Sequence, residues 1–255
     1  KALSMALDRA EIVDIAAYGY PTANFNVGGI GELYGPFIDS EVTAKYQDIT
    51  QYNPEKANQL LDAAGYKDTN GDGMRENPDG SEAKINIMVV NGWTDWVQTV
   101  QMATEYLREI GIDASTRTVE IGNLIENFKS SEYEAGILWG DVGSTPHSFY
   151  QNVLHTKGKG VALQANHGIY SDEMDSLLDE FTRTTDKARQ LEISAKLQEF
   201  VAKNLMLIPI FSNPEWYQYS TSRFVGWPTE KDPYINPRFY DDGSRALMIN
   251  NLHLK

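Results

Sequence analysis

The fold is decided by residues 84–119, which read KINIMVVNGWTDWVQTVQMATEYLREIGIDASTRTV. Residues 84–90 first alternate between polar and apolar side chains and then run apolar, which predicts a buried β-strand. Residues 94–110 repeat apolar side chains at helical spacing, and Gly111 is typical of a helix end. A second strand is expected over residues 112–119. Because a helical crossover joins parallel strands, this unit predicts an α/β fold with a mixed, mostly parallel sheet flanked by helices.

Further helices and strands are expected on both sides of this unit. Asn53 followed by Pro54 predicts a helix that ends near Gly65, and Asp8 starts another that runs to about residue 17. Residues 18–46 are rich in Gly, Tyr and Pro and predict a long ordered loop. The remaining helices are expected over residues 1–7 and 122–129 and after Ser171 and Asp186, and the remaining strands over residues 133–139, 205–211, 216–220 and 246–252.

Composition limits the classes of partner and chemistry. The 255 residues carry a formal net charge of −14, which argues against nucleic acid and anionic membranes as partners. The absence of cysteine excludes a disulfide framework and thiol catalysis. The longest apolar run, residues 205–211, is too short to span a bilayer. No pattern indicates a cofactor, and none is expected.

The first residues already follow a helical pattern, with Leu3, Ala6 and Leu7 on one face. No residue precedes them to cap that helix. We therefore expect the chain to be an excised piece of a longer protein, in which case the lack of a signal peptide carries no information.

Residues 68–80, DTNGDGMRENPDG, begin like a calcium loop. Gly73 occupies the turn position, and Asp79 occupies the twelfth position, where such loops usually carry Glu. Arg75 stands where an apolar residue is usual. A strand rather than a helix follows, so a polar connection between a helix and a strand is the simpler interpretation, and bound calcium is an alternative.

Candidate ligand-binding residues lie near the ends of predicted strands and the starts of loops. Trp139 and Asp141 follow an apolar strand, at the place where α/β proteins bind ligands. Indole rings offer flat apolar faces with a polar edge, which suit sugars and peptide side chains. The remaining candidates, chosen by position, are Trp93, Asn166, Asn213 and Trp216. The four histidines lack metal-ligand spacing, no phosphate-binding loop is present, and the protein is not expected to be an enzyme.

The order of motifs along nearly the whole chain resembles the C-terminal lobe of the oligopeptide/dipeptide-type (bacterial extracellular) solute-binding proteins of ABC importers. The segments that carry this resemblance are KALSMALDRAEIV at 1–13, NPEKA through LLDAAGY at 53–66, the DTNGDG loop, WGD at 139–141, NHGIY at 166–170, TDKAR at 185–189 and LIPI at 207–210.

The resemblance implies a periplasmic-binding-protein-like lobe over residues 1–225. It also implies a long irregular C-terminal segment, residues 226–255, that returns toward a missing N-terminal lobe. In the family's peptide binders the acid that matches Asp141 holds the peptide's α-ammonium group. The second acid that often precedes Pro146 is absent here, and residues 226–234 are similar to the branch that binds oligosaccharides. A short peptide and an oligosaccharide are therefore equal candidates for the ligand.

The resemblance further implies a membrane-bound ABC permease as partner and an extracytoplasmic location, either periplasmic or as a cell-surface lipoprotein. Two alternatives stay open at this point. One is a fragment of a glycoside hydrolase, which would need two carboxylates facing each other across a cleft. The other is a calcium-stabilised extracellular scaffold module.

Overall fold

The computed structural model describes residues 1–140, 143–214, 217–237 and 242–255. Contacts divide the chain into two compact units, unit 1 (Lys1–Asn213) and unit 2 (Pro214–Lys255). The predicted division after residue 225 differs from this contact boundary, and its meaning for the domains of the intact protein stays a prediction. Within the described residues, no helix combines the length and the apolar composition that crossing a membrane requires.

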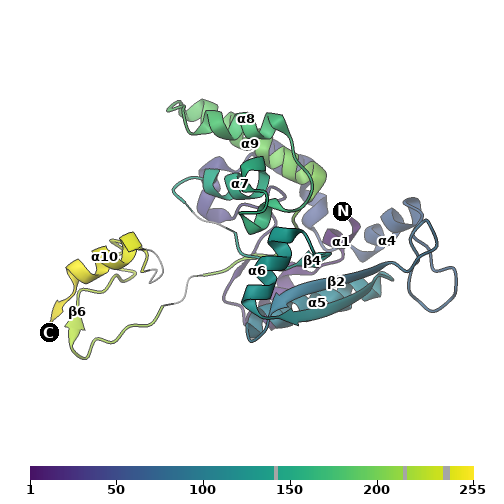
Figure 1. The fold of residues 1–255 in the computed structure, drawn as a ribbon, viewed down its shortest axis with the longest axis horizontal. Helices are drawn as coiled ribbons and strands as arrows, with labels where there is room; N and C mark the ends of the chain where they lie inside the picture. The colour runs from purple at the N-terminus through teal and green to yellow at the C-terminus, as the bar shows by residue number, and fades with distance from the viewer. Residues whose placement is uncertain (141–142, 215–216, 238–241) are drawn as a thin grey trace. The chain divides into compact units, whose positions relative to one another are not determined.

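Unit 1 contains the predicted parallel sheet, with strand order β3–β2–β4 (Figure 1). β2 (Lys84–Val90) pairs in register with the whole of β3 (Asp113–Val119), so the predicted strand–helix–strand unit is confirmed. β4 is limited to Ala135–Gly136, shorter than the predicted strand over 133–139. One further backbone bond, from Ile137 N to Met88 O, continues the ladder before the chain leaves the sheet toward Trp139.

Two helices cover the two faces of β2, as its alternating side chains require (Figure 1). α5 (Thr94–Glu109) contributes Leu107 to the cluster against which Ile85 and Ile87 pack. α6 (Ile121–Ser130) contributes to the cluster that contains Met88 and Val90. The second half of the central strand, residues 88–90, is therefore buried on both sides, which explains why its alternation gives way to an apolar run there.

The largest apolar cluster of unit 1 is built mainly from helices. Asp186 accepts a hydrogen bond from Ala188 N and begins α9, as predicted, whereas Ser171 begins α8 without a side-chain capping bond. The segments in this part of unit 1 are α7 (His147–Leu154), η3 (Thr156–Gly158), η4 (Leu163–Ala165), α8 (Asp172–Phe181) and α9 (Lys187–Asn204).

The N-terminal part of the chain contains more regular structure than the sequence predicted. The helix starts at Asp8 and Asn53 are confirmed, because both side chains accept hydrogen bonds from the first turn. The expectation of one long loop over residues 18–46 is wrong, because Asp39 caps an additional helix. The elements here are α1 (Ala2–Met5), α2 (Arg9–Ala16), β1 (Thr22–Ala23), η1 (Glu32–Phe37), α3 (Ser40–Tyr46), η2 (Gln47–Thr50) and α4 (Pro54–Ala63).

The predicted strand over residues 205–211 is wrong for most of its length. Only β5 (Phe211–Ser212) is extended and paired, antiparallel to β1. Leu205, which follows the last residue of α9, adopts the left-handed conformation. The apolar side chains after it do not lie on one face of a sheet: Met206 and Leu207 pack against one cluster, and the three from Ile208 to Phe211 pack against another. Apolar composition alone therefore indicated packing against the core, which is partial except at Pro209, but it did not indicate the backbone conformation.

The described residues of unit 2 form one helix and one antiparallel pair of short strands that are far apart in the sequence. β6 (Phe224–Val225) pairs antiparallel with β7 (His253–Leu254). The strand predicted over 246–252 is wrong, because α10 (Asp242–Asn251) is a helix that buries Ser244 and Met248 at a spacing of four residues. In the region predicted as a strand over 216–220, residues 217–220 form none.

Arg9 is the most deeply buried charged side chain of unit 1 that the structure describes, at 1 % exposure. Its Nε donates to Pro209 O at 2.8 Å, and its Nη1 donates to Thr50 O at 2.8 Å and to Ser4 O at 3.0 Å. Nη1 also reaches Leu7 O at 3.3 Å, and Nη2 donates to Ser4 Oγ at 2.8 Å. One guanidinium therefore ties the start of the chain to η2 and to the segment that leads into β5.

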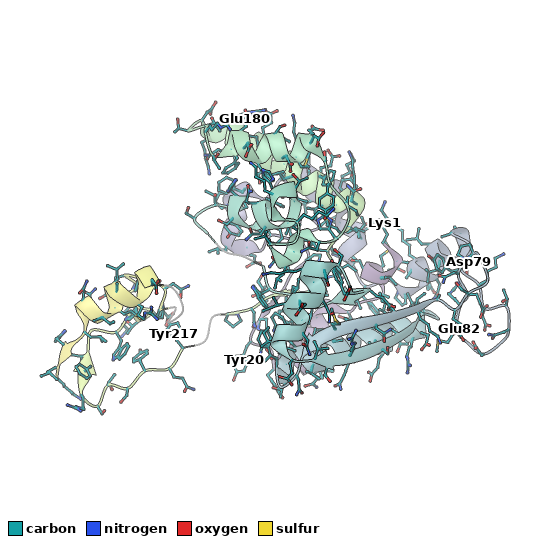
Figure 2. The ribbon with its side chains drawn as sticks, viewed as in Figure 1. Lys1, Tyr20, Asp79, Glu82, Glu180 and Tyr217 are labelled. Carbon is teal, nitrogen blue, oxygen red and sulfur yellow. The ribbon has the colours of Figure 1, made fainter. Side chains whose placement is uncertain are left out.

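The loop over residues 68–80 is held by its own side chains. Asp68 accepts hydrogen bonds from Gly71 N and Gly73 N, and the buried Glu76 accepts from Thr69. Arg75 docks the loop on the ends of α4 and α5. Its guanidinium donates to Asp62 Oδ1, Tyr66 O, Asn58 Oδ1 and Ile110 O. Asp79 and Glu82 lie in the part of the loop that precedes β2 (Figure 2).

Candidate functional site: an aromatic cluster at the sheet edge

The candidate site begins at the turn between β2 and α5. Asn91 N donates to Val119 O at 2.8 Å, which extends the pairing of β2 with β3 by one residue. Gly92 then adopts φ +81°, a conformation that side-chain-bearing residues rarely adopt, and Trp93 becomes the residue before α5. The turn therefore places an indole at the carboxyl edge of the parallel sheet, where ligands bind in α/β folds.

Three indoles meet at this edge. The ring centroids of Trp93 and Trp96 lie 5.1 Å apart in an edge-to-face arrangement. The ring of Trp139 lies 5.9 Å from Trp93 and 6.3 Å from Trp96. Trp93 and Trp139 stay 37 % and 36 % exposed, so part of their ring surface is open to solvent. We call Trp93, Trp96 and Trp139 the aromatic cluster.

Trp139 is positioned by contacts from two other segments. Gln164 Nε2, from η4, donates to Trp139 O at 2.8 Å. A Cβ at Gly140 would lie 3.3 Å from the ring of Phe149, so the chain passes close to α7 at this point. The main chain at residues 139–140 is therefore held by η4 and α7.

Asn166 belongs to the loop that supplies Gln164. Its side chain is buried, accepts from Gly160 N at 2.7 Å and donates to Ala162 O at 2.7 Å. Tyr133 Oη donates to the Asn166 carbonyl at 2.9 Å, and burial raises the pKa of Tyr133. These bonds give Asn166 a role in shaping the loop, and its predicted contact with a ligand stays a prediction.

Of the other predicted residues, the structure describes Asn213 but neither Asp141 nor Trp216. Asn213 is exposed and is the last residue of unit 1. Asp141 and Trp216 lie outside the described residues. Among the predicted residues, the structure thus brings together Trp93 and Trp139.

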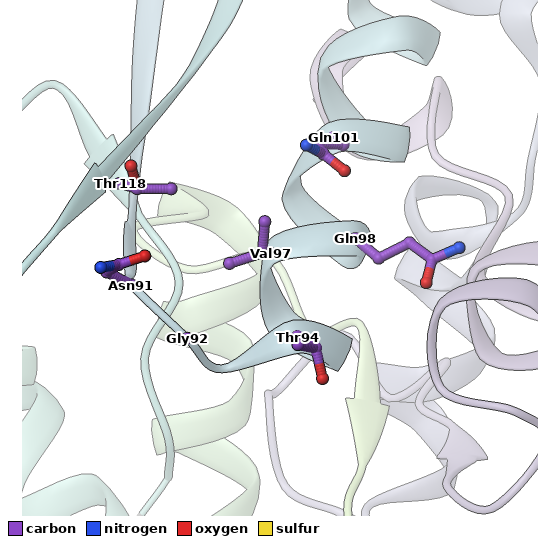
Figure 3. A pocket seen from close by; sticks show the side chains of 7 residues that line it. All are labelled: Asn91, Gly92, Thr94, Val97, Gln98, Gln101 and Thr118. Carbon is purple, nitrogen blue, oxygen red and sulfur yellow. The ribbon is translucent and has the colours of Figure 1, made fainter.

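Sequence reasoning missed Trp96 and a neighbouring cavity. Trp96 follows Trp93 by three residues, a spacing that places two side chains on one side of a helix and was available as a signal. The cavity has a volume of about 420 Å³ and lies beside the β2–α5 turn (Figure 3). Its lining residues are Asn91, Gly92, Thr94, Val97, Gln98, Gln101 and Thr118.

The buried histidines of unit 1 serve the packing of its helices. His155 is 2 % exposed, and its ring lies 3.3 Å from Asp175 and 3.4 Å from Asp179. Burial lowers the pKa of His147, whose Nε2 contacts Leu178 O, and also that of His167. In the parts of the chain that the structure describes, His, Cys, Asp and Glu side chains form no group of three suited to a metal ion.

The comparison with protein families identifies residues 1–161, which include β2, α5 and the aromatic cluster. These residues match the model of the bacterial extracellular solute-binding proteins, family 5 (middle part). The chain belongs to this family. A curated member, the oligopeptide-binding protein AppA of Bacillus subtilis, is 27 % identical over 243 residues, which are 88 % of this chain and 41 % of AppA.

Solved structures of family 5 solute-binding proteins share the fold. The periplasmic oligopeptide-binding protein of an oligopeptide ABC transporter from Thermotoga maritima is 29 % identical, with a TM-score of 0.85 over the whole chain. Another structure of that protein has mannohexaose bound. AppA in complex with a nonapeptide gives a TM-score of 0.75 at 20 % identity. The present chain spans about half the length of these structures, 49 % and 46 %.

Proposed function

We propose that this chain is one ligand-binding lobe of an extracytoplasmic solute-binding protein that delivers a short peptide or an oligosaccharide to an ABC permease. Its family is one of solute-binding proteins, and the similar proteins of B. subtilis and T. maritima carry names that refer to oligopeptide binding or transport. Neither a hydrolase nor a scaffold module has comparable support. In the proposed mechanism the ligand binds the closed state more tightly and shifts a hinge equilibrium between two lobes.

The aromatic cluster is the observation that carries this proposal. It lies at the carboxyl edge of a parallel sheet, and two of its three rings stay about one-third exposed. Such rings stack on the apolar faces of sugars or on peptide side chains, and their N–H edges donate hydrogen bonds. In the proposal Trp93, Trp96 and Trp139 form one wall of the ligand site. Asp141, two positions after Trp139 in the sequence, is the carboxylate that the proposal assigns to ligand binding from its sequence position alone.

The proposal also assigns a partner to unit 2, namely an N-terminal lobe of the same protein. Unit 2 buries few of its own apolar side chains, and Leu254, Ile249 and Leu247 are 69 %, 63 % and 47 % exposed. Apolar side chains left open in this way favour a covering partner. The length of the relatives leaves room for that lobe, since the chain covers 41 % of AppA.

A substitution experiment tests the proposal in the protein that contains both lobes. Trp139→Ala and Trp93→Ala are each expected to weaken ligand binding about 10- to 100-fold, because each removes a large, partly exposed ring from the site. Isothermal titration calorimetry against short peptides and oligosaccharides measures the affinity. Tyr18→Ala, which removes an exposed ring of unit 1 that is not part of the aromatic cluster, serves as the control.

The proposal fails if the wild-type protein binds neither class of ligand. It also fails if both cluster variants bind with the affinity of the wild-type protein. In addition, the 255-residue chain alone is expected to bind little or no ligand, because it supplies only one wall of the site.

A further inference from the structure

The cavity beside the aromatic cluster has an uncharged, polar lining. Carboxamides come from Asn91, Gln98 and Gln101, hydroxyls from Thr94 and Thr118, and an apolar patch from Val97. Its volume, about 420 Å³, falls within the range of small-molecule sites, roughly 300–1,000 Å³. Gly92 and Thr94 line the cavity, and Trp93 between them belongs to the aromatic cluster, so the two features adjoin at one turn.

Several polar groups in this cavity are not used by the protein itself. The side chains of Thr94, Gln101 and Thr118 make no hydrogen bond to any residue that the structure describes. Figure 3 shows Val97 and Gln101 projecting from α5 on the side that faces Thr118. Donors and acceptors of this kind in an open cavity are available to a ligand.

The neighbouring Glu120 places a negative charge beside the cavity, which affects the kind of ligand group that can bind there. Its Oε1 accepts a hydrogen bond from Asn91 Nδ2 at 3.3 Å, which leaves Asn91 Oδ1 as an acceptor toward the cavity. A ligand carboxylate would meet this negative charge without a cation among the lining residues. A ligand hydroxyl, in contrast, finds carboxamides and hydroxyls that both donate and accept.

We propose that this cavity is a subsite for one neutral sugar unit of an oligosaccharide whose neighbouring units stack on the aromatic cluster. The inference rests on the proposed function and narrows its ligand class from peptide or sugar to sugar. Gln101 and Thr118 bind hydroxyl groups, and Val97 contacts the apolar C–H face of the sugar ring. A peptide's carboxyl terminus is disfavoured, because its negative charge would lie beside Glu120 with no cation among the lining residues.

The test uses the protein that contains both lobes and the double variant Gln101→Ala/Thr118→Val. Both substitutions favour the local structure, since Ala is the stronger helix former and Val suits a strand, so the variant is expected to fold. Titration calorimetry is carried out with mannohexaose, cellohexaose, stachyose and a set of tri- to pentapeptides. Gln51→Ala removes an exposed carboxamide outside the cavity and is the control.

The wild-type protein is expected to bind at least one oligosaccharide, and the double variant is expected to bind it about 10- to 30-fold more weakly, with the control unchanged. Equal affinity of the double variant and the wild-type protein would overturn the subsite and leave the proposed function intact. Binding of peptides but of no sugar would overturn the inference and again leave solute binding intact. If the wild-type protein binds neither class, the proposed function itself fails, and the inference fails with it.

Discussion

Replacing Arg9 by Met tests whether one buried guanidinium holds the N-terminal part of unit 1 together. Met has a similar apolar stem but no donor, so Pro209 O, Thr50 O and Leu7 O each lose a hydrogen bond from a cation. Ser4 O also loses one but keeps the bond from Leu7 N, so it is not included in the cost. Burial lowers the pKa of Arg9 to about 10, and the side chain is therefore still charged at neutral pH.

The cost of Arg9→Met follows from these contacts. A buried acceptor that loses its donor costs about 1–3 kcal/mol, so three carbonyls amount to about 3–9 kcal/mol. Removing a buried cation returns several kcal/mol of desolvation energy. We expect a net loss of about 3–5 kcal/mol in the free energy of unfolding. For a unit of about 200 residues this lowers Tm by about 6–20 °C.

Thermal unfolding followed by far-ultraviolet circular dichroism measures this effect. Arg117→Met is the matched control, because Arg117 is an exposed arginine on β3 and its replacement is expected to change the free energy of unfolding by less than about 0.5 kcal/mol. Arg9→Lys is expected to fall between the two, since an ammonium keeps the charge but cannot reproduce the planar fork. If Arg9→Met melts within about 2 °C of the wild-type chain, then the guanidinium does not hold this junction.

Three further results are expected. Lys45 and Lys203 lower the pKa of Glu199 from 4.5 to about 2, so its stabilising effect is present above pH 4.5 and is lost as the pH falls toward 2. Between pH 5 and pH 3, the Tm of Glu199→Gln should therefore fall by less than the Tm of the wild-type chain. An equal fall in both proteins would contradict this. Gly226→Ala should speed up amide hydrogen exchange in unit 2 and leave unit 1 unchanged. The added Cβ would lie 2.3 Å from Asn251 O, and the residue would have to adopt φ +91°. Unchanged protection of α10 would contradict the expected clash. A chain ending at Asn213 should keep the Tm of unit 1 within a few degrees, measured by calorimetry, and a large drop would show that unit 2 stabilises it.

The parts of the fold that the sequence predicted are those whose signal is local. The sequences of β2, α5 and β3 show the side-chain periodicity of a strand or a helix within each element. The helix α4 is marked by its capping residue Asn53 and by Gly65 after its end. The strand predicted over residues 205–211 is wrong because these side chains, partly buried except at Pro209, pack against several different clusters, and such packing does not require an extended backbone. The strand predicted over residues 246–252 is wrong because the prediction followed the apolar content. The buried residues, Ser244 and Met248, are spaced four apart, as on one face of a helix.

The residues of the candidate site, like the elements of the fold, were predicted only in part. Trp93 and Trp139 were found because strand ends of a parallel sheet share one edge. Gln101 and Thr118 were not found, because an exposed polar residue on a helix or strand has no local pattern that separates ligand contact from solvation. Asn166 was chosen by position alone. Its side-chain hydrogen bonds reach only four and six residues back along the chain, and no sequence pattern separated such loop-shaping bonds from contact with a ligand.

The closeness of three indoles also has an optical consequence. Transitions of aromatic rings at such short separations couple to one another, and the edge-to-face pair Trp93–Trp96 gives a chiral arrangement that contributes to the circular dichroism of the protein. Emission from these rings depends on their contact with water, since Trp93 and Trp139 are partly exposed. A molecule that covers the rings should therefore change the spectrum of the unlabelled protein, so occupancy can be followed without attaching a dye.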